Sequence, residues 1–359
     1  MAKYISWIGI LFIIFSTGCT NSSSTLGSPP TISADLQPSL PATLAVSQPT
    51  IAVSPTPTNQ PVLHPMSIPA MRAGEYPGSE IYIERELDRG LNYRRYYAYY
   101  YSDELKIFGL LTIPESPMPS IGWPAIVFNH GYIPPDDYRT TERYINYVDR
   151  LATSGYIVFR IDYRGHDRSE GEARGAYGDP GYEIDVLNAI ASIKKHPSVN
   201  PDRIGLWGHS MGGYLSLRAM VITKDVRAGV IWAGVVASYP EMLYNWRRTG
   251  PFTASPSSRG GGWRDAWITE YGTPEQNPEF WNSVSATNYL GDLSGPLQLH
   301  HGTADKDVPL EFSIRLAELA RFAGKPADLY TYEGDNHNIS KYFSLAMDRT
   351  ITFYDDYLK

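Results

Sequence analysis

The sequence has only one cysteine, Cys19, in 359 residues. A single cysteine cannot form a disulfide within the chain, so the folded part must be stabilised by its hydrophobic core. Hydrophobic residues make up 42% of the sequence, which is enough to build such a core. Positive charge is also scarce, because the formal net charge is −7 and no basic stripe is visible. We therefore expect no nucleic-acid partner.

Sequence motifs that hold metals or cofactors are missing as well. There is no His-Glu-x-x-His pattern, no pair of cysteines and no dense cluster of carboxylates. No glycine-rich phosphate loop opens a strand–helix unit. We therefore expect a reaction that needs neither a metal nor another cofactor.

The N-terminal residues resemble a bacterial lipoprotein signal. Lys3 precedes an apolar run, residues 4–15, that is too short to span a membrane comfortably. Small residues then lead to Cys19, although Ser16 stands where such signals usually carry leucine. We predict that residues 1–19 are a signal peptide with Cys19 as the lipidation site, and that the protein is exported and lipid-anchored in a bacterial cell envelope. The alternatives are an ordinary secretory signal, which would give a secreted protein, and an uncleaved anchor.

Residues 20–70 are rich in serine, threonine and proline and have few aromatic or charged residues. Such a segment cannot bury enough apolar surface to offset the conformational entropy that ordering would cost. We predict a disordered tether over residues 20–70 and one folded domain over residues 71–359.

Short apolar runs alternate with segments of helical spacing throughout the predicted domain. The strand-like runs are residues 93–101, 105–113, 125–129, 156–162, 203–207, 228–232, 297–301 and 327–332, and the helical segments are residues 141–154, 181–195, 214–222, 310–322 and 341–358. Short apolar strands that alternate with helices predict an α/β protein, with a mostly parallel sheet and helices on both faces. The first two runs predict an antiparallel hairpin.

The segment of residues 238–293 interrupts this alternation. It contains Trp246, Trp263, Trp267 and Trp281 and lies between two predicted strands of the sheet. We predict that it forms a cap over the carboxyl edge of the sheet, where ligands bind in open α/β sheets. Its tryptophans predict apolar or aromatic pocket walls.

The pattern Gly-x-Ser-x-Gly occurs at residues 208–212, between a predicted strand and a predicted helix. A turn this sharp leaves no room for side chains at the two glycines, and it holds the hydroxyl of Ser210 above the sheet at a helix N-terminus. We predict that Ser210 is a nucleophile and that the Met211 N–H stabilises the oxyanion. The alternative is a tight turn with an unreactive serine.

A serine nucleophile needs a base to take its proton and an acid to orient that base. Asp305 follows the predicted strand 297–301, and His337 lies in a later loop with no apolar residue. We predict Asp305 as the acid and His337 as the base. Asp307 is the alternative acid, although its place beside a helix start suits a capping role. A solvated loop histidine is the alternative reading of His337.

An oxyanion needs a second hydrogen-bond donor besides the Met211 amide. His130, Gly131 and Tyr132 follow the predicted strand 125–129, and the glycine lets the backbone turn its amides toward the site. We assign the second donor to the Tyr132 N–H. A plain turn is the alternative.

These motifs together resemble the catalytic domain of the prolyl oligopeptidase family of serine peptidases, peptidase family S9. The resemblance is carried by residues 208–213, 301–309 and 335–337, and further by 129–131, 162–165 and 200–205. It implies an α/β-hydrolase fold and a serine mechanism with Ser210, Asp305 and His337 as the catalytic triad.

Large members of that family carry a β-propeller before the catalytic domain, and here the stretch 71–101 is too short for one. The resemblance implies a serine peptidase that cleaves short peptides. The alternative is a carboxylesterase that acts on small acyl or aryl esters. A third hypothesis, a non-catalytic binding protein on a hydrolase scaffold, is disfavoured because no triad residue is lost. The sequence makes no prediction about the oligomeric state.

Overall fold

The computed structural model describes residues 63–246 and 262–359. The predicted signal peptide, the lipidation of Cys19 and nearly all of the predicted tether lie outside these residues, as does part of the predicted cap. Of the helices in the described residues, none combines the length and the apolar character that a membrane span requires.

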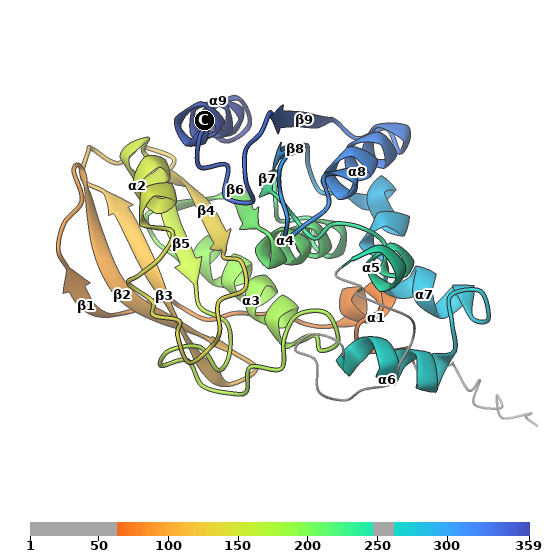
Figure 1. The fold of residues 1–359 in the computed structure, drawn as a ribbon. Coiled ribbons are helices and arrows are strands. Elements are labelled where there is room, and N and C mark those ends of the chain that lie inside the picture. The colour runs from red at the N-terminus through yellow and green to blue at the C-terminus, as the bar shows by residue number, and fades with distance from the viewer. Residues whose placement is uncertain (1–62, 247–261) are drawn as a thin grey trace, which may run out of the picture. The chain divides into compact units, whose positions relative to one another are not determined.

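A single nine-stranded sheet forms the centre of the described fold (Figure 1). Its strands are β1 (Tyr82–Leu87), β2 (Tyr93–Ser102), β3 (Leu105–Pro114), β4 (Trp123–Asn129), β5 (Ile157–Ile161), β6 (Val199–His209), β7 (Ala228–Trp232), β8 (Leu297–Gly302) and β9 (Ala327–Tyr332). They lie in the order β1-β2-β3-β5-β4-β6-β7-β8-β9. The pairings from β1 to β5 are antiparallel and those from β5 to β9 are parallel, as the predicted hairpin and parallel sheet require.

Helices cover both faces of the sheet (Figure 1). They are α1 (Ile68–Ala73), α2 (Ile145–Thr153), α3 (Gly181–Lys195), α4 (Met211–Ile222), α5 (Tyr239–Asn245), α6 (Gly262–Tyr271), α7 (Pro278–Val284), η1 (Ala286–Asp292), α8 (Leu310–Phe322) and α9 (Phe343–Leu358). Alternate residues of β4 belong to two different clusters: Ile126 and Phe128 pack with α2 and α9, and Ala125 and Val127 pack with α3, α4 and α8. This alternation buries both faces of the strand.

The fold begins before residue 71, which corrects the boundary of the predicted tether. Residues 63–70 include the start of α1, and Met66 and Ile68 are fully buried. The His64 ring contacts the rings of Trp267 and Phe280. The proline-rich composition gave no sign of this short helix. Its few apolar side chains are buried by residues that are distant in the sequence, so no local pattern marks it.

Helix α2 begins at Ile145 and not at residue 141 as predicted. Arg143 and Tyr144 adopt left-handed backbone conformations, with φ angles of 55° and 50°. A helix cannot pass through such residues, so the apolar spacing of residues 141–154 overstated its length. The two residues instead form a wall beside the candidate site.

The tryptophans of segment 238–293 are mostly buried. Trp246, Trp267 and Trp281 are 7%, 5% and 0% exposed. The Trp267 ring contacts those of Tyr239, Trp263, Phe280 and Trp281. These rings form a core beneath the helices of the segment, which differs from the predicted pocket walls.

Candidate active site

The candidate site lies at the ends of two neighbouring parallel strands whose connections run to opposite sides of the sheet. From β4 the chain continues to β5 on one side, and from β6 it continues to β7 on the other. Asn129 at the end of β4 pairs in register with Gly208 near the end of β6. The loops that follow the two strands therefore diverge and leave a crevice, the usual ligand position in open α/β sheets.

Ser210 occupies the turn between β6 and α4. Its φ of 55° and ψ of −116° are strained for a residue with a side chain. A Cβ atom at Gly212 would lie 1.9 Å from the carbonyl oxygen of Asn129, and one at Gly208 would lie 2.3 Å from that of Gly212. Both glycines are therefore required for the close approach of β4, β6 and α4, and the strand–turn–helix geometry of a nucleophile elbow is present.

The loop after β4 lies against Ser210. A Cβ atom at Gly131 would lie 3.2 Å from the Cβ of Ser210 and 2.7 Å from the hydroxyl oxygen of Tyr144. The backbone of Tyr132, the predicted second oxyanion donor, directly follows this contact. The structure thus brings together the two segments that carry the predicted Met211 and Tyr132 donors.

His337 and Asp305 hydrogen bond to each other. The Nδ1 atom of His337 lies 2.7 Å from Oδ2 of Asp305. The other oxygen of Asp305 accepts the backbone N–H groups of Asp307, at 2.8 Å, and Val308, at 3.1 Å. Asp305 therefore hydrogen bonds to His337, and the backbone amide of Asp307 in turn holds the Asp305 carboxylate.

A second imidazole, that of His301, also contacts Asp305. Its Nε2 lies 3.1 Å from Oδ2 of Asp305 and 3.1 Å from the carbonyl oxygen of Val308, so this nitrogen carries the proton. Nδ1 then accepts from the hydroxyl of Ser313 at 2.8 Å. Burial alone would raise the pKa of Asp305, but the hydrogen bonds from His301 and His337 bring it well below its usual range. Asp305 is therefore ionised at neutral pH.

The histidine within the elbow, His209, connects three parts of the site. Its Nδ1 lies 2.7 Å from the hydroxyl of Tyr144, which also accepts the N–H of Gly131 at 3.0 Å. Its Nε2 lies 3.1 Å from the carbonyl oxygen of His337. The Tyr144 hydroxyl therefore donates to Nδ1, and Nε2–H donates to the carbonyl. Burial lowers the pKa of His209 to about 3, with a smaller contribution from His337, so this neutral tautomer persists at neutral pH.

Asp335 fixes the loop that presents His337. Its buried carboxylate accepts the backbone N–H groups of Asn336 at 2.8 Å, Lys341 at 3.2 Å and Tyr342 at 2.9 Å. These bonds close the turn between β9 and α9 around its first residues. The sequence did not predict the roles of Tyr144, His209, His301 and Asp335. Only Asp335 could have been suspected from the sequence, because it lies two residues before the predicted base, His337.

In the described part of the chain, the Ser210 hydroxyl does not hydrogen bond to the His337 imidazole. The His337 ring instead lies 4.6 Å, between centroids, from the ring of His209, the residue directly before Ser210. Catalytic hydrogen bonds are commonly long in free enzymes and tighten when substrate binds. The bond from Nδ1 to Asp305 leaves Nε2 of His337 available for the serine.

Ligand atoms of Asp305, Asp307 and His337 lie within 4.8 Å of one another, a spacing compatible with a metal ion. Both carboxylate oxygens of Asp305 already accept hydrogen bonds, and Nδ1 of His337 is engaged with Asp305. A cation would have to displace these bonds, so this arrangement suits proton transfer better than metal binding.

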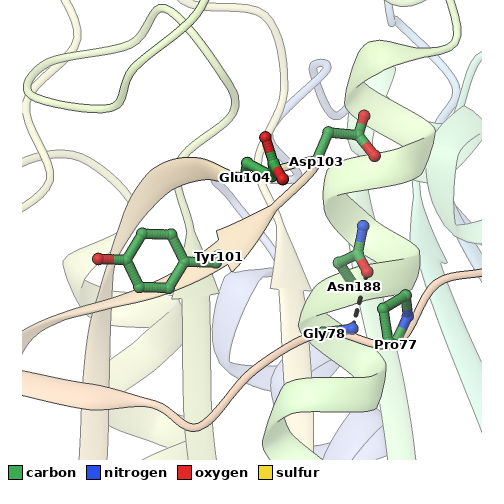
Figure 2. Close-up of a pocket in the computed structure, with 6 residues that line it drawn as sticks. All are labelled: Pro77, Gly78, Tyr101, Asp103, Glu104 and Asn188. Carbon is green, nitrogen blue, oxygen red and sulfur yellow. Dashed lines mark hydrogen bonds between the residues drawn. The ribbon is translucent and has the colours of Figure 1, made fainter.

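Two cavities formed by described residues bear on the position of the site. One, of about 390 Å³, adjoins the site and is lined by Tyr132, Ile133, Pro134, Arg143, Tyr144, Tyr147 and Asn338. The other, of about 540 Å³, lies at the turn between β2 and β3 beside α3; Figure 2 shows its lining residues Pro77, Gly78, Tyr101, Asp103, Glu104 and Asn188. None of the predicted site residues lines the second cavity, although it is the larger.

The sheet order, the flanking helices and the elbow define an α/β-hydrolase fold, as predicted. The chain belongs to the prolyl oligopeptidase family, whose model matches residues 144–359, more than half of the chain. The resemblance drawn from the sequence motifs is thereby confirmed, and the protein is a serine hydrolase.

Among relatives, an uncharacterized peptidase of Bacillus subtilis, YtmA, is 26% identical over 245 residues, 68% of this chain and 86% of that protein. Human dipeptidyl peptidase 8 is 27% identical over 253 residues, 65% of this chain but only 25% of that much longer protein. An acetyl xylan esterase structure from Paenibacillus sp. R4 has a TM-score of 0.58 at 18% identity, and the match covers 81% of this chain and 92% of that one. Peptidases and esterases therefore share this fold.

Proposed function

We propose that the protein hydrolyses short peptides through an acyl-enzyme intermediate, with Ser210 as nucleophile, His337 as general base and Asp305 as the acid that orients it. The observation that carries this proposal is the 2.7 Å hydrogen bond between His337 and Asp305 on loops that flank the strained serine turn. Family membership supports the same assignment, since YtmA, which this chain covers almost throughout, bears a peptidase name.

The proposed reaction begins when Ser210 Oγ attacks the substrate carbonyl carbon and its proton passes to Nε2 of His337. The ionised Asp305 stabilises the imidazolium that forms. The N–H groups of Met211 and Tyr132 donate to the oxyanion of the tetrahedral intermediate. The C–N bond then breaks, and the amine leaves with the proton from His337. Water, activated by the same imidazole, releases the acyl group and restores the serine.

Small acyl or aryl esters are the second candidate substrates. An alkoxide or phenoxide leaves more readily than an amine, so an enzyme that cleaves amides also cleaves activated esters. The described residues place no propeller over the site. The measurement that separates the two functions is kcat/KM for an ester and an amide of the same acyl group. A measurable kcat/KM for the amide beside that for the ester supports a peptidase. Hydrolysis of the ester alone supports a carboxylesterase.

The proposed nucleophile is tested by Ser210→Ala. We expect the variant to fold normally and to lose about four orders of magnitude in kcat, because covalent catalysis is removed. A fluorophosphonate probe should label the native protein and not the variant. Retention of more than about a tenth of the activity would show that Ser210 is not the nucleophile.

We further propose that the protein is held at a bacterial membrane by lipid on Cys19, with residues 20–62 as the connecting segment. The position of the only cysteine after an apolar run motivates this proposal. Intact-mass analysis of detergent-extracted protein tests it. A mature chain that starts at Cys19 with lipid attached is the expected result, and a mature chain that retains Met1 would refute it.

A further inference from the structure

The cavity of about 390 Å³ touches two of the loops that form the proposed site. Tyr132 in its wall directly follows Gly131, whose backbone lies against Ser210. Asn338 in its wall directly follows His337. A substrate bound with its carbonyl at Ser210 would therefore extend one of its ends into this cavity.

The wall formed by Arg143 and Tyr144 is held in place through its backbone and that of the residues just before it. The buried guanidinium of Arg160, on β5, donates to the carbonyl oxygens of Thr140, Glu142 and Arg143. These bonds stabilise the left-handed backbone of Arg143 and Tyr144. A wall fixed in this way loses little conformational entropy when a ligand binds, which favours affinity.

Two tyrosine hydroxyls fix the other sides of the cavity. The Tyr144 hydroxyl bonds the Gly131 amide, and the Tyr147 hydroxyl donates to the carbonyl oxygen of Asn338 at 3.1 Å. Both hydroxyls are thus occupied by the protein itself. What these tyrosines offer a ligand is mainly the carbon surface of their rings.

Arg143 supplies the charge of this cavity. It is the only charged residue among the described residues that line it, so no lining carboxylate neutralises it. Its side chain is exposed, and no hydrogen bond or ion pair joins the guanidinium to another described residue. Its backbone carbonyl, by contrast, is held by Arg160. The backbone of Arg143 is therefore held in place, while its guanidinium has no partner among the described residues.

We propose that this cavity, which we call the Arg143 pocket, binds a carboxylate of the substrate, and that Arg143 is the residue that determines this specificity. The guanidinium presents two parallel N–H donors that match a carboxylate, and the tyrosine rings contact the carbon skeleton that carries it. This inference rests on the proposed function, because it names the substrate class of the same site: acidic acyl compounds or short peptides with a nearby carboxylate.

The test uses two matched pairs of esters, one for each side of the scissile bond. On the acyl side the pair is the 4-nitrophenyl hemiester of adipic acid and 4-nitrophenyl hexanoate, with spontaneous hydrolysis subtracted. On the leaving-group side the pair is 4-acetoxybenzoate and its methyl ester. We expect the native protein to favour the charged member of at least one pair by about tenfold in kcat/KM, mainly through KM.

Arg143→Gln should lower that preference about tenfold, Arg143→Lys should lower it less, and Arg143→Glu should reverse it. The matched control is Arg89→Gln, which removes an exposed arginine that pairs with Glu86 and Glu115 and lines neither cavity; it should keep the native preference. In the native protein the preference should also weaken as ionic strength rises, because salt screens an exposed charge pair.

Two results would overturn the inference: a native protein that prefers the neutral ester in both pairs, or a preference that Arg143→Gln and added salt leave unchanged. Either result leaves the proposed function intact if the neutral esters are still cleaved and Ser210→Ala abolishes that cleavage. If Ser210→Ala cleaves them as well as the native protein, the proposed function itself fails.

Discussion

Two segments with many aromatic residues follow strands of the sheet, and the structure uses their side chains in opposite ways. Residues 130–147, which follow β4 and include the first residues of α2, place Tyr132, Tyr144 and Tyr147 in the wall of a cavity beside Ser210. The described parts of residues 238–292, between β7 and β8, instead bury Trp267 and Trp281 against other rings.

The difference follows from the hydroxyl group of tyrosine and the larger apolar surface of tryptophan. A tyrosine hydroxyl can bond the backbone of a loop while its ring stays beside a cavity, as the Tyr144 and Tyr147 hydroxyls do. A tryptophan offers a larger apolar surface, and its burial contributes more to stability. Changes near the site should therefore alter activity, and changes beneath the helices of residues 238–292 should alter stability.

The largest expected effect distinguishes the two aspartates of the site. Asp305→Asn should lower kcat by about three to four orders of magnitude, because the amide cannot stabilise the His337 imidazolium or hold the required tautomer. Asp307→Asn, two residues away in the same turn, is the matched control and should retain activity within a few-fold. Steady-state kinetics on a neutral 4-nitrophenyl ester measures both. Equal losses in the two variants would contradict the assignment of Asp305.

The second prediction concerns the buried aromatic core of residues 238–292. Trp281→Ala should lower the free energy of unfolding by about 3–5 kcal/mol, because it leaves a large cavity. Urea titration measures the loss, and the folded fraction should keep its ratio of activities on different esters. Trp263→Ala, at a partly exposed ring, is the control and should cost less. Trp281→Ala could instead change the ratio of activities on different esters and leave the free energy of unfolding unchanged. That result would show that Trp281 lines the substrate pocket, as the sequence predicted.

The third prediction concerns pH and compares two histidines, His209 in the elbow and His64 beside the ring of Trp267. Burial lowers the pKa of His209 to about 3, below the ordinary value of about 6.5 that the unfolded chain should have. The unfolded chain therefore binds a proton below about pH 6.5 that the folded chain does not, and stability falls as the pH drops.

His209→Gln should remove this contribution. The stability that is lost between pH 7 and pH 4.5 should then be smaller by about 2 kcal/mol than in the native protein. His64, which packs under Trp267, is only half-buried, and its pKa is lowered mainly by that burial. His64→Gln should therefore reduce the loss less than His209→Gln does. Urea titrations across this pH range provide the measurement, and identical slopes for His209→Gln and the native protein would exclude a buried neutral His209.

The smallest expected effect concerns the hydroxyl that joins the loop after β4 to the elbow. Tyr144→Phe leaves the Gly131 N–H and Nδ1 of His209 without their partner, so we expect kcat/KM for neutral esters to fall about tenfold. Tyr147→Phe is the matched control, because its hydroxyl bonds the carbonyl of Asn338 in the same cavity. It should lose less. An equal loss in both variants would mean that Tyr144 acts only as part of the wall.

Most of the sheet was predictable because its signals are local. Buried parallel strands read as short apolar runs, and the predicted spans of β7, β9, α3 and α8 agree with the structure. Two of the elements that were missed, α1 and β1, have weak local patterns. Most residues of β1 are exposed, and α1 is only six residues long with Met71 and Ile68 buried against the rest of the fold.

The sequence by itself determined the succession along the chain of most strands and helices, the elbow around Ser210 and the positions of Asp305 and His337 after two later strands. These follow from side-chain periodicity and from turns too tight for any residue but glycine, which act over a few neighbouring residues. Only the tertiary structure decided that Asp305 hydrogen bonds to His337, that Tyr144 meets His209 across 65 residues, and that the guanidinium of Arg143 stands beside the site without a partner among the described residues. Such contacts depend on how distant loops meet at the edge of the sheet, which no local pattern records.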